Sequence, residues 1–201
     1  MTFAEALAEQ RWDDHRYYHH NRVNQALHLV SALSFIAAYG LLFVSTSAAV
    51  LLAWLVAMPS RQVGHFFFEP HDYDHVNQAS HEHKEAIKVG YNLFRKAVLL
   101  TIWAASPLLL IGDPTLFGTL TAATTWMAFA DNVSTIWLAV ALGAVVFRTV
   151  QLFFLRDVQT GLVWSAKILT DPFHDVKLYW RSPLQLLRGE LYDPALGERT
   201  A

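Results

Sequence analysis

The sequence contains no cysteine, which excludes disulfides and thiolate metal sites, so any metal has to be held by nitrogen and oxygen ligands. It also lacks a glycine-rich phosphate loop and a Gly-x-Ser-x-Gly elbow, which argues against nucleotide chemistry and acyl transfer. Basic residues (15) and acidic residues (17) nearly balance, so charge gives no reason to expect a nucleic-acid partner. No basic segment followed by an apolar run opens the chain, so we expect no cleavable signal peptide.

Hydrophobic residues make up 54% of the 201 residues and charged residues only 16%, an apolar balance that is high for a soluble domain. The apolar segments are 26–43, 48–58, 97–111 and 133–155. A helix needs roughly 20 residues to cross a bilayer, and the shorter segments have to borrow residues from their flanks or tilt. The sequence therefore predicts an all-α integral membrane bundle of about four spans. The alternative is a soluble all-helical protein with buried helices.

The expected organisation is a single membrane domain over residues 1–201. Its parts are a cytoplasmic N-terminal segment (1–25), a helical hairpin (26–58), a His-rich cytoplasmic region (59–96), further membrane helices (97–155) and a cytoplasmic tail of short amphipathic helices (156–201). Within the fourth part, the Thr-rich stretch 116–130 is interpreted as an interfacial or re-entrant helix. Lys and Arg avoid the turns at 45–47 and 112–115, so the positive-inside rule places both termini and the His-rich region in the cytoplasm.

The stretch from Gln62 to His83 holds five of the ten histidines, with Asp and Glu between them. Imidazole is the commonest metal ligand, so we interpret this stretch as metal-binding; the alternative is a solvated polar loop. A helix that begins at Pro70 would place four residues on one face, namely His71, His75, Gln78 and Glu82. His65 and Glu69 are also one helical turn apart, as are His81 and Glu85.

A second group of histidines lies near the N-terminus, in His15-Arg-Tyr-Tyr-His19-His20. Asn21 can cap a helix that starts there, which places His19 and His20 just before it and puts Asn24 and His28 on one face. With His71-x-x-x-His75, this group resembles the histidine boxes of membrane fatty-acid desaturases and hydroxylases, which hold two irons. The third box usual in those enzymes is not evident in the sequence.

A closer resemblance is to the membrane-bound 2-hydroxy fatty acid dioxygenase family. The segment Tyr18-His19-His20-Asn21-Arg-Val-Asn24-Gln-Ala-Leu-His28 is followed by an apolar hairpin and then by Gln62-Val-Gly-His65-Phe-Phe-Phe-Glu69. Six residues match the family pattern in position and spacing: His19, Asn24, His28, Gly64, His65 and Glu69. The resemblance covers roughly the first third of the chain.

This resemblance implies an Fe(II) enzyme of fatty-acid alpha-oxidation that uses dioxygen, without 2-oxoglutarate, to shorten a long-chain 2-hydroxy fatty acid by one carbon. Its implied partners are that substrate and the lipid bilayer; the oligomeric state stays open. It implies a catalytic or positioning role for Asn24 and Glu69, with Glu69 either a ligand or a partner that orients a histidine. The expected metal ligands are His19, His28 and His65, and the further candidates are His20, His71, His75, His81 and His83.

Two other functions remain open at this point. One is a di-iron lipid hydroxylase or desaturase, which would hold two metal ions per chain. The other is a non-enzymatic metal-binding membrane scaffold or transporter. A transporter should carry ionisable residues in mid-span, and the apolar segments contain almost none apart from Arg148.

Overall fold

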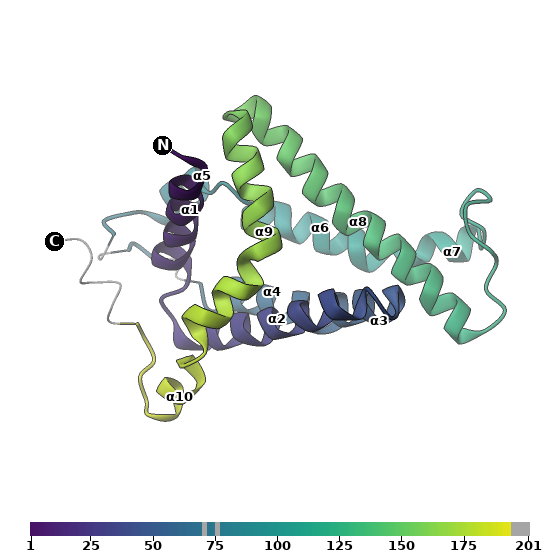
Figure 1. Cartoon of the computed structure of the whole chain (residues 1–201), viewed down its shortest axis with the longest axis horizontal. Coiled ribbons are helices and arrows are strands. Elements are labelled where there is room, and N and C mark those ends of the chain that lie inside the picture. The colour runs from purple at the N-terminus through teal and green to yellow at the C-terminus, as the bar shows by residue number, and fades with distance from the viewer. Residues whose placement is uncertain (70–71, 75–76, 194–201) are drawn as a thin grey trace.

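The computed structural model describes residues 1–69, 72–74 and 77–193. Within them every named element is a helix and no strand is present, which confirms the predicted all-α class. The elements, shown in Figure 1, are α1 (Phe3–Tyr18), α2 (Arg22–Leu41), α3 (Thr46–Leu52), the π-helix η1 (Ala53–Ala57), α4 (Met58–Phe67), α5 (His81–Ile87), α6 (Leu93–Ala105), the 3-10 helix η2 (Ser106–Leu108), α7 (Leu109–Gly112), α8 (Trp126–Leu155), α9 (Val158–Tyr179) and α10 (Ser182–Leu187).

The helices form an open triangle in Figure 1. The α2 helix lies along one side and packs mainly against α4 and α9, while α8 and α9 join at an apex and diverge. The α1 helix packs on α9, with Met1 beside Gln159 near the start of α9, while the C-terminal end of the described chain lies at the start of α2, where Asp193 bonds Arg22. Segments far apart in sequence are thereby brought to one corner of the molecule.

Local sequence explains where the first helices begin. Thr2 and Glu5 form a capping box at the start of α1, and the helix runs to Tyr18, well beyond the first ten residues. The Asn21 side chain accepts a hydrogen bond from the backbone N–H of Val23, so the predicted cap of α2 is confirmed. The short connection between α1 and α2 contains His19 and His20.

Two helical stretches are long and apolar enough to cross a membrane, by length and composition: Leu93–Gly112 and Trp126–Leu155. Only 11% of either apolar stretch is buried, so both present their hydrophobic side chains outward instead of filling a core. Phe94, Leu142 and Phe154 are examples of the exposed residues. An apolar surface of this extent favours contact with lipid. The count of about four spans remains a prediction.

The long helix α8 also carries Arg148, the ionisable residue that the sequence places inside an apolar segment. Its guanidinium is buried and donates hydrogen bonds to the carbonyls of Val89 and Gly90 and to the side chain of Gln151. These hydrogen bonds connect α8 to the segment before α6. Arg148 therefore has a structural role, and its hydrogen bonds offset the cost of burying its charge.

Three expectations about helices are wrong. Residues 116–125 are not helical, with turns at 116–119 and positive φ at Leu116 (45°) and Phe117 (57°), and a helix begins only at Trp126, for which Thr125 is the N-cap. The region after 155 contains the 22-residue helix α9, which is capped by Asp157 and continues through its interior Pro172, where short helices were expected. The length of α9 follows from packing on α1, α2 and α8, which local propensity does not reveal.

The third error concerns the predicted helix from Pro70 through Glu82. Residues 72–74 and 77–80 are not helical: Asp74 and Ala79 exchange two backbone hydrogen bonds, and Gln78 has a φ of 50°. The next helix, α5, starts only at His81, capped by Ser80. A shared helical face with Gln78 and Glu82 is therefore ruled out. The other two members of that face, His71 and His75, and the predicted first residue of the helix, Pro70, lie outside the described residues.

Candidate metal centre

Three buried histidines from three different elements meet at the corner where α1, α2 and α4 approach. His19 follows α1 as its C-cap, His28 lies on the second turn of α2, and His65 lies near the end of α4. One nitrogen from each lies within 4.8 Å of the others. Their exposed fractions are 3%, 0% and 6%, so this cluster, which we call the histidine triad, is closed to solvent.

Hydrogen bonds fix the tautomers of two triad members. The Nδ1 of His28 lies 2.9 Å from the backbone carbonyl oxygen of Asn24, and the Nδ1 of His65 lies 2.8 Å from Oε2 of Glu69. Both partners are acceptors, so each Nδ1 carries the proton and donates it. Each Nε2 is then a bare lone pair, and the two Nε2 atoms face one another at 3.3 Å.

The third member, His19, is held by Tyr179 from α9. The Tyr179 hydroxyl lies 3.1 Å from Nδ1 of His19 and 3.1 Å from Nδ1 of His15, and it is fully enclosed. A hydroxyl has one proton, so it can accept from His19 and donate to His15. The Nε2 of His19 has no hydrogen-bond partner in the structure and is buried. In this arrangement it too carries an unpaired lone pair.

The triad is electrically suited to a cation. Burial holds the pKa of His19 and of His65 well below the usual range, and burial lowers the pKa of His15 to about 4, so these rings are neutral near pH 7. Buried lone pairs that face one another without a donor are costly. Two nitrogens bound to one metal at about 2.1 Å each lie roughly 3 Å apart when the angle is near 90°, close to the observed 3.3 Å. The donor set fits a first-row transition metal.

Glu69 supports the triad from behind His65. One carboxylate oxygen accepts from His65, and the other accepts from Nζ of Lys88 at 3.1 Å. Lys88 in turn donates to Glu85 at 3.1 Å. This carboxylate–imidazole pair orients the ring and makes its Nε2 more basic, as carboxylates behind metal-binding histidines commonly do.

Asn24 lies directly beneath the triad, fully buried between α2 and α4. Its amide nitrogen donates to the carbonyl of Tyr18 at 2.8 Å, while its Oδ1 has no partner in the structure. A Cβ placed on Gly64 would come within 2.2 Å of that Oδ1 and 3.3 Å of the His28 ring. The glycine at position 64 is thus what lets α4 approach α2 closely enough to bring His65 to His28.

Of the other predicted metal ligands, those that the structure describes are not in this group. The ring of His20 bonds the carbonyl of Arg16 and lies 3.7 Å from Asp74. His81 and His83 lie on the first turn of α5, where His83 is exposed. His71 and His75 lie outside the described residues. Sequence reasoning missed Tyr179 and Lys88 as supports, because nothing in their local sequence indicates the triad as their neighbour.

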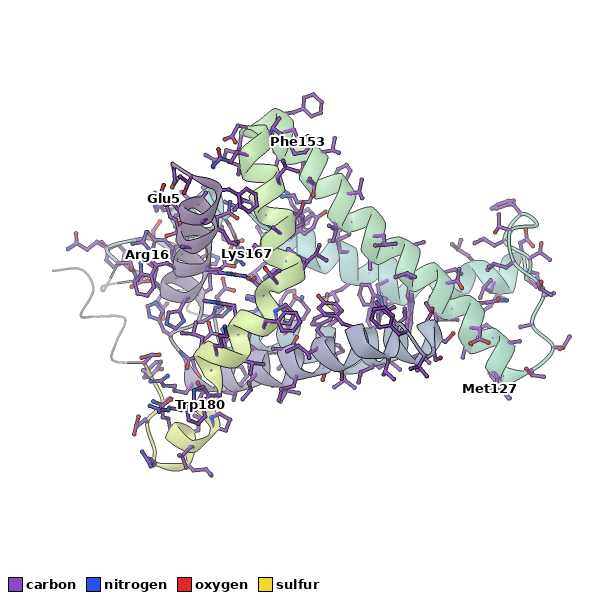
Figure 2. The ribbon with its side chains drawn as sticks, in the orientation of Figure 1. Glu5, Arg16, Met127, Phe153, Lys167 and Trp180 are labelled. Atoms are coloured by element: carbon purple, nitrogen blue, oxygen red, sulfur yellow. The ribbon has the colours of Figure 1, made fainter. Side chains whose placement is uncertain are left out.

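A cavity of about 380 Å³ reaches the triad at His65, within the size range of sites for small organic ligands. It is lined by residues of α1, α2, η1, α4, α6, α8 and α9, by the end of α5 and by the segment before α6. Its apolar lining includes Phe35, Trp54, Leu99, Val140 and Trp164. Its charged lining includes Arg61, Lys88, Lys96, Lys167, Asp14 and Asp171. Such a cavity suits a molecule with a polar end and a hydrocarbon chain. Figure 2 shows Lys167 on α9 beside α1.

The segment that contains the triad matches the model of a known protein family. No curated protein and no solved structure matches the chain. Residues 6–73 match the model of the Mpo1-like family, described as 2-hydroxy-palmitic acid dioxygenase Mpo1-like. This segment contains all three triad histidines, Asn24 and Glu69. The resemblance predicted from the sequence is therefore confirmed: over residues 6–73, the chain is similar to the Mpo1-like family of 2-hydroxy fatty acid dioxygenases.

Proposed function

We propose that this protein is an Fe(II)-dependent dioxygenase that converts a long-chain 2-hydroxy fatty acid to the acid one carbon shorter. The observation that carries the proposal is the convergence of three Nε2 atoms within a segment matched by a dioxygenase family. The metal would be held by His19, His28 and His65. Three protein ligands leave coordination positions for dioxygen and for the hydroxyl and carboxylate of the substrate.

The overall reaction balances without an added reductant. A 2-hydroxy acid and dioxygen give the shortened acid, carbon dioxide and water. Cleavage of the bond between C1 and C2, with oxidation of C2 to a carboxyl carbon and of C1 to carbon dioxide, supplies the four electrons that dioxygen accepts. Iron, when bound, supplies the redox chemistry with dioxygen. No serine or cysteine nucleophile is required, in agreement with the residues that surround the triad.

The chain's own residues position the reactants and exclude water. Glu69 and Lys88 hold His65 in one tautomer, and Tyr179 holds His19. The cavity beside His65 would take the hydrocarbon chain along its apolar wall. The burial of the triad histidines limits the access of bulk water to the metal, which strengthens electrostatic interactions there.

The test is the reaction itself. Reduced, iron-loaded protein incubated in air with 2-hydroxyhexadecanoic acid should consume oxygen and release pentadecanoic acid, whereas hexadecanoic acid, which lacks one chelating arm, should react poorly. Hydroxylation or desaturation of hexadecanoic acid with the 2-hydroxy acid untouched would instead establish the di-iron alternative. In the described residues one group of three possible ligands is present, which favours a single metal.

We propose in addition that the protein is integral to the membrane, with about four spans and with both termini and the triad on the cytoplasmic side. The exposed apolar stretches Leu93–Gly112 and Trp126–Leu155 support membrane insertion, and the distribution of Lys and Arg supports the orientation. A reporter fused after Ala201 should be active in the cytoplasm. Activity confined to the opposite side would contradict this topology.

A further inference from the structure

The cations around the cavity are nearly all paired with carboxylates. Arg61 lies 3.1 Å from Asp175, Lys88 lies 3.1 Å from both Glu69 and Glu85, and Lys167 lies 2.6 Å from Asp171 and also bonds Asp14. Each pairing offsets part of the cost of holding a charge away from water. Charge balance within the protein therefore accounts for three of the four lysine and arginine side chains that line the cavity.

Lys96 is the exception. It lies on the first turn of α6 and lines the cavity, yet in the described part of the chain its Nζ makes no hydrogen bond or ion pair. It is only partly accessible, and the charged groups around it are Lys88 and Arg61, of the same sign, and Glu69 and Asp14, of the opposite sign, none of which pairs with it. An unpaired ammonium in such a space is costly unless an anion enters. The cavity itself is the place from which such an anion can reach it.

Lys96 shares this cavity with the triad, because Lys96 and His65 both line it. Lys96 lies outside the segment 6–73, so its position beside the triad is a feature of this fold that the family match does not include.

We propose that Lys96 binds the carboxylate of the acyl substrate and so fixes its head group beside His65. This inference rests on the proposed function, because it takes the ligand to be a fatty acid. The apolar lining at Phe35, Trp54 and Val140 then receives the hydrocarbon chain. A cavity of about 380 Å³ has room for one such chain, whereas a phospholipid brings two chains and a larger head group. A single-chain carboxylate is therefore the ligand that matches both the charge and the volume.

The experiment compares 2-hydroxyhexadecanoic acid with its methyl ester, which has the same chain and hydroxyl but no charge. Binding to the full-length, chelator-treated protein is followed by tryptophan fluorescence, since Trp54 and Trp164 line the cavity. The wild-type protein should bind the acid about 10- to 100-fold more tightly than the ester, the range expected for one charge-assisted hydrogen bond. In Lys96→Met this preference should fall to within about 3-fold, while ester binding is unchanged.

Two variants complete the design. Lys96→Arg keeps the charge and should retain most of the preference for the acid, and Lys177→Met removes an exposed lysine on α9 and should retain all of it. Ester binding reports that Lys96→Met is folded; if that variant does not fold, Lys96→Gln replaces it. An undiminished preference in Lys96→Met or in its replacement Lys96→Gln, or no preference in the wild type, overturns the assignment. An intact preference for the acid without any conversion by the iron-loaded protein overturns the proposed reaction alone.

Discussion

The Nε2 atoms of His28 and His65 lie 3.3 Å apart and are buried. The Nδ1 atom of each ring donates the ring's proton to an acceptor, which is the Asn24 carbonyl for His28 and the Glu69 carboxylate for His65. Two lone pairs held face to face are unfavourable without a positive charge between them. The backbone of α2 and the carboxylate of Glu69 impose this arrangement. A metal ion is the simplest group that would relieve it, and the unpaired Nε2 of His19 supplies a third ligand.

Glu69→Gln should weaken metal binding by about 10- to 100-fold while leaving the fold intact. The glutamine can still accept from His65, but it removes the negative charge that raises the basicity of the ring. Competition with a chelator would measure the affinity. Glu85→Gln is the matched control, because Glu85 also bonds Lys88 but does not touch the triad. Equal affinities for wild type and Glu69→Gln would contradict a supporting role for Glu69.

Gly64→Ala should destabilise the protein by about 1–3 kcal/mol and impair metal binding, because the new methyl group would lie 2.2 Å from Oδ1 of Asn24. Denaturant unfolding in detergent, with and without metal, would measure both effects. Gly143→Ala, in α8, is the control: a Cβ there meets nothing within 4 Å, so that variant should be neutral or slightly more stable. A Gly64→Ala protein as stable as wild type would show that α2 and α4 are not closely packed there.

Asp175 should make stability depend on pH between about 4 and 6. Burial raises the pKa of its carboxyl from 3.8 to about 6, although Arg61 opposes the shift. A carboxyl with a raised pKa in the folded state favours folding below pH 4 and loses that contribution as pH rises through 6. Asp175→Asn should remove this loss, which amounts to at most about 3 kcal/mol at 1.36 kcal/mol per pKa unit.

Unfolding of wild type and Asp175→Asn across this pH range would test the expectation. The unfolding free energy of the wild type, relative to that of the variant, should fall as the pH is raised from 4 to 6. The variant also lacks the ion pair with Arg61, which the wild type makes only when Asp175 is ionised, and the effect of this pair is already contained in the Asp175 pKa of about 6. Parallel profiles for the two proteins would mean that the Asp175 carboxyl titrates normally in the folded state.

The parts of the site that the sequence predicts are those governed by short-range rules. The Asn21 cap and the four-residue spacing of His65 and Glu69 are local, and the structure shows both contacts. His19 lies just before the Asn21 cap and His28 lies within the helix that the cap begins, so the sequence places both near the start of α2. Their convergence with His65 then follows once the two arms of the hairpin pack together, which the α2–α4 contact provides.

The parts that sequence reasoning missed depend on tertiary packing or on competing turns. Tyr179 reaches His19 across 160 positions in the chain, and no local pattern indicates that contact. Beyond residue 70, periodicity favoured a helix, but the side chain of Asp74 accepts from the backbone N–H of Asn77 and a turn forms. Asp and Asn side chains often compete with helical hydrogen bonding in this way.

The most direct test of the central claim is the iron content of anaerobically purified protein after loading with Fe(II), compared among variants. We predict one iron per chain in the wild type and in His83→Ala, whose ring is exposed on α5, and a loss of most of the iron in His19→Ala, His28→Ala and His65→Ala. Retention of one full equivalent of iron by a folded His28→Ala or His65→Ala protein would show that the triad is not the metal site.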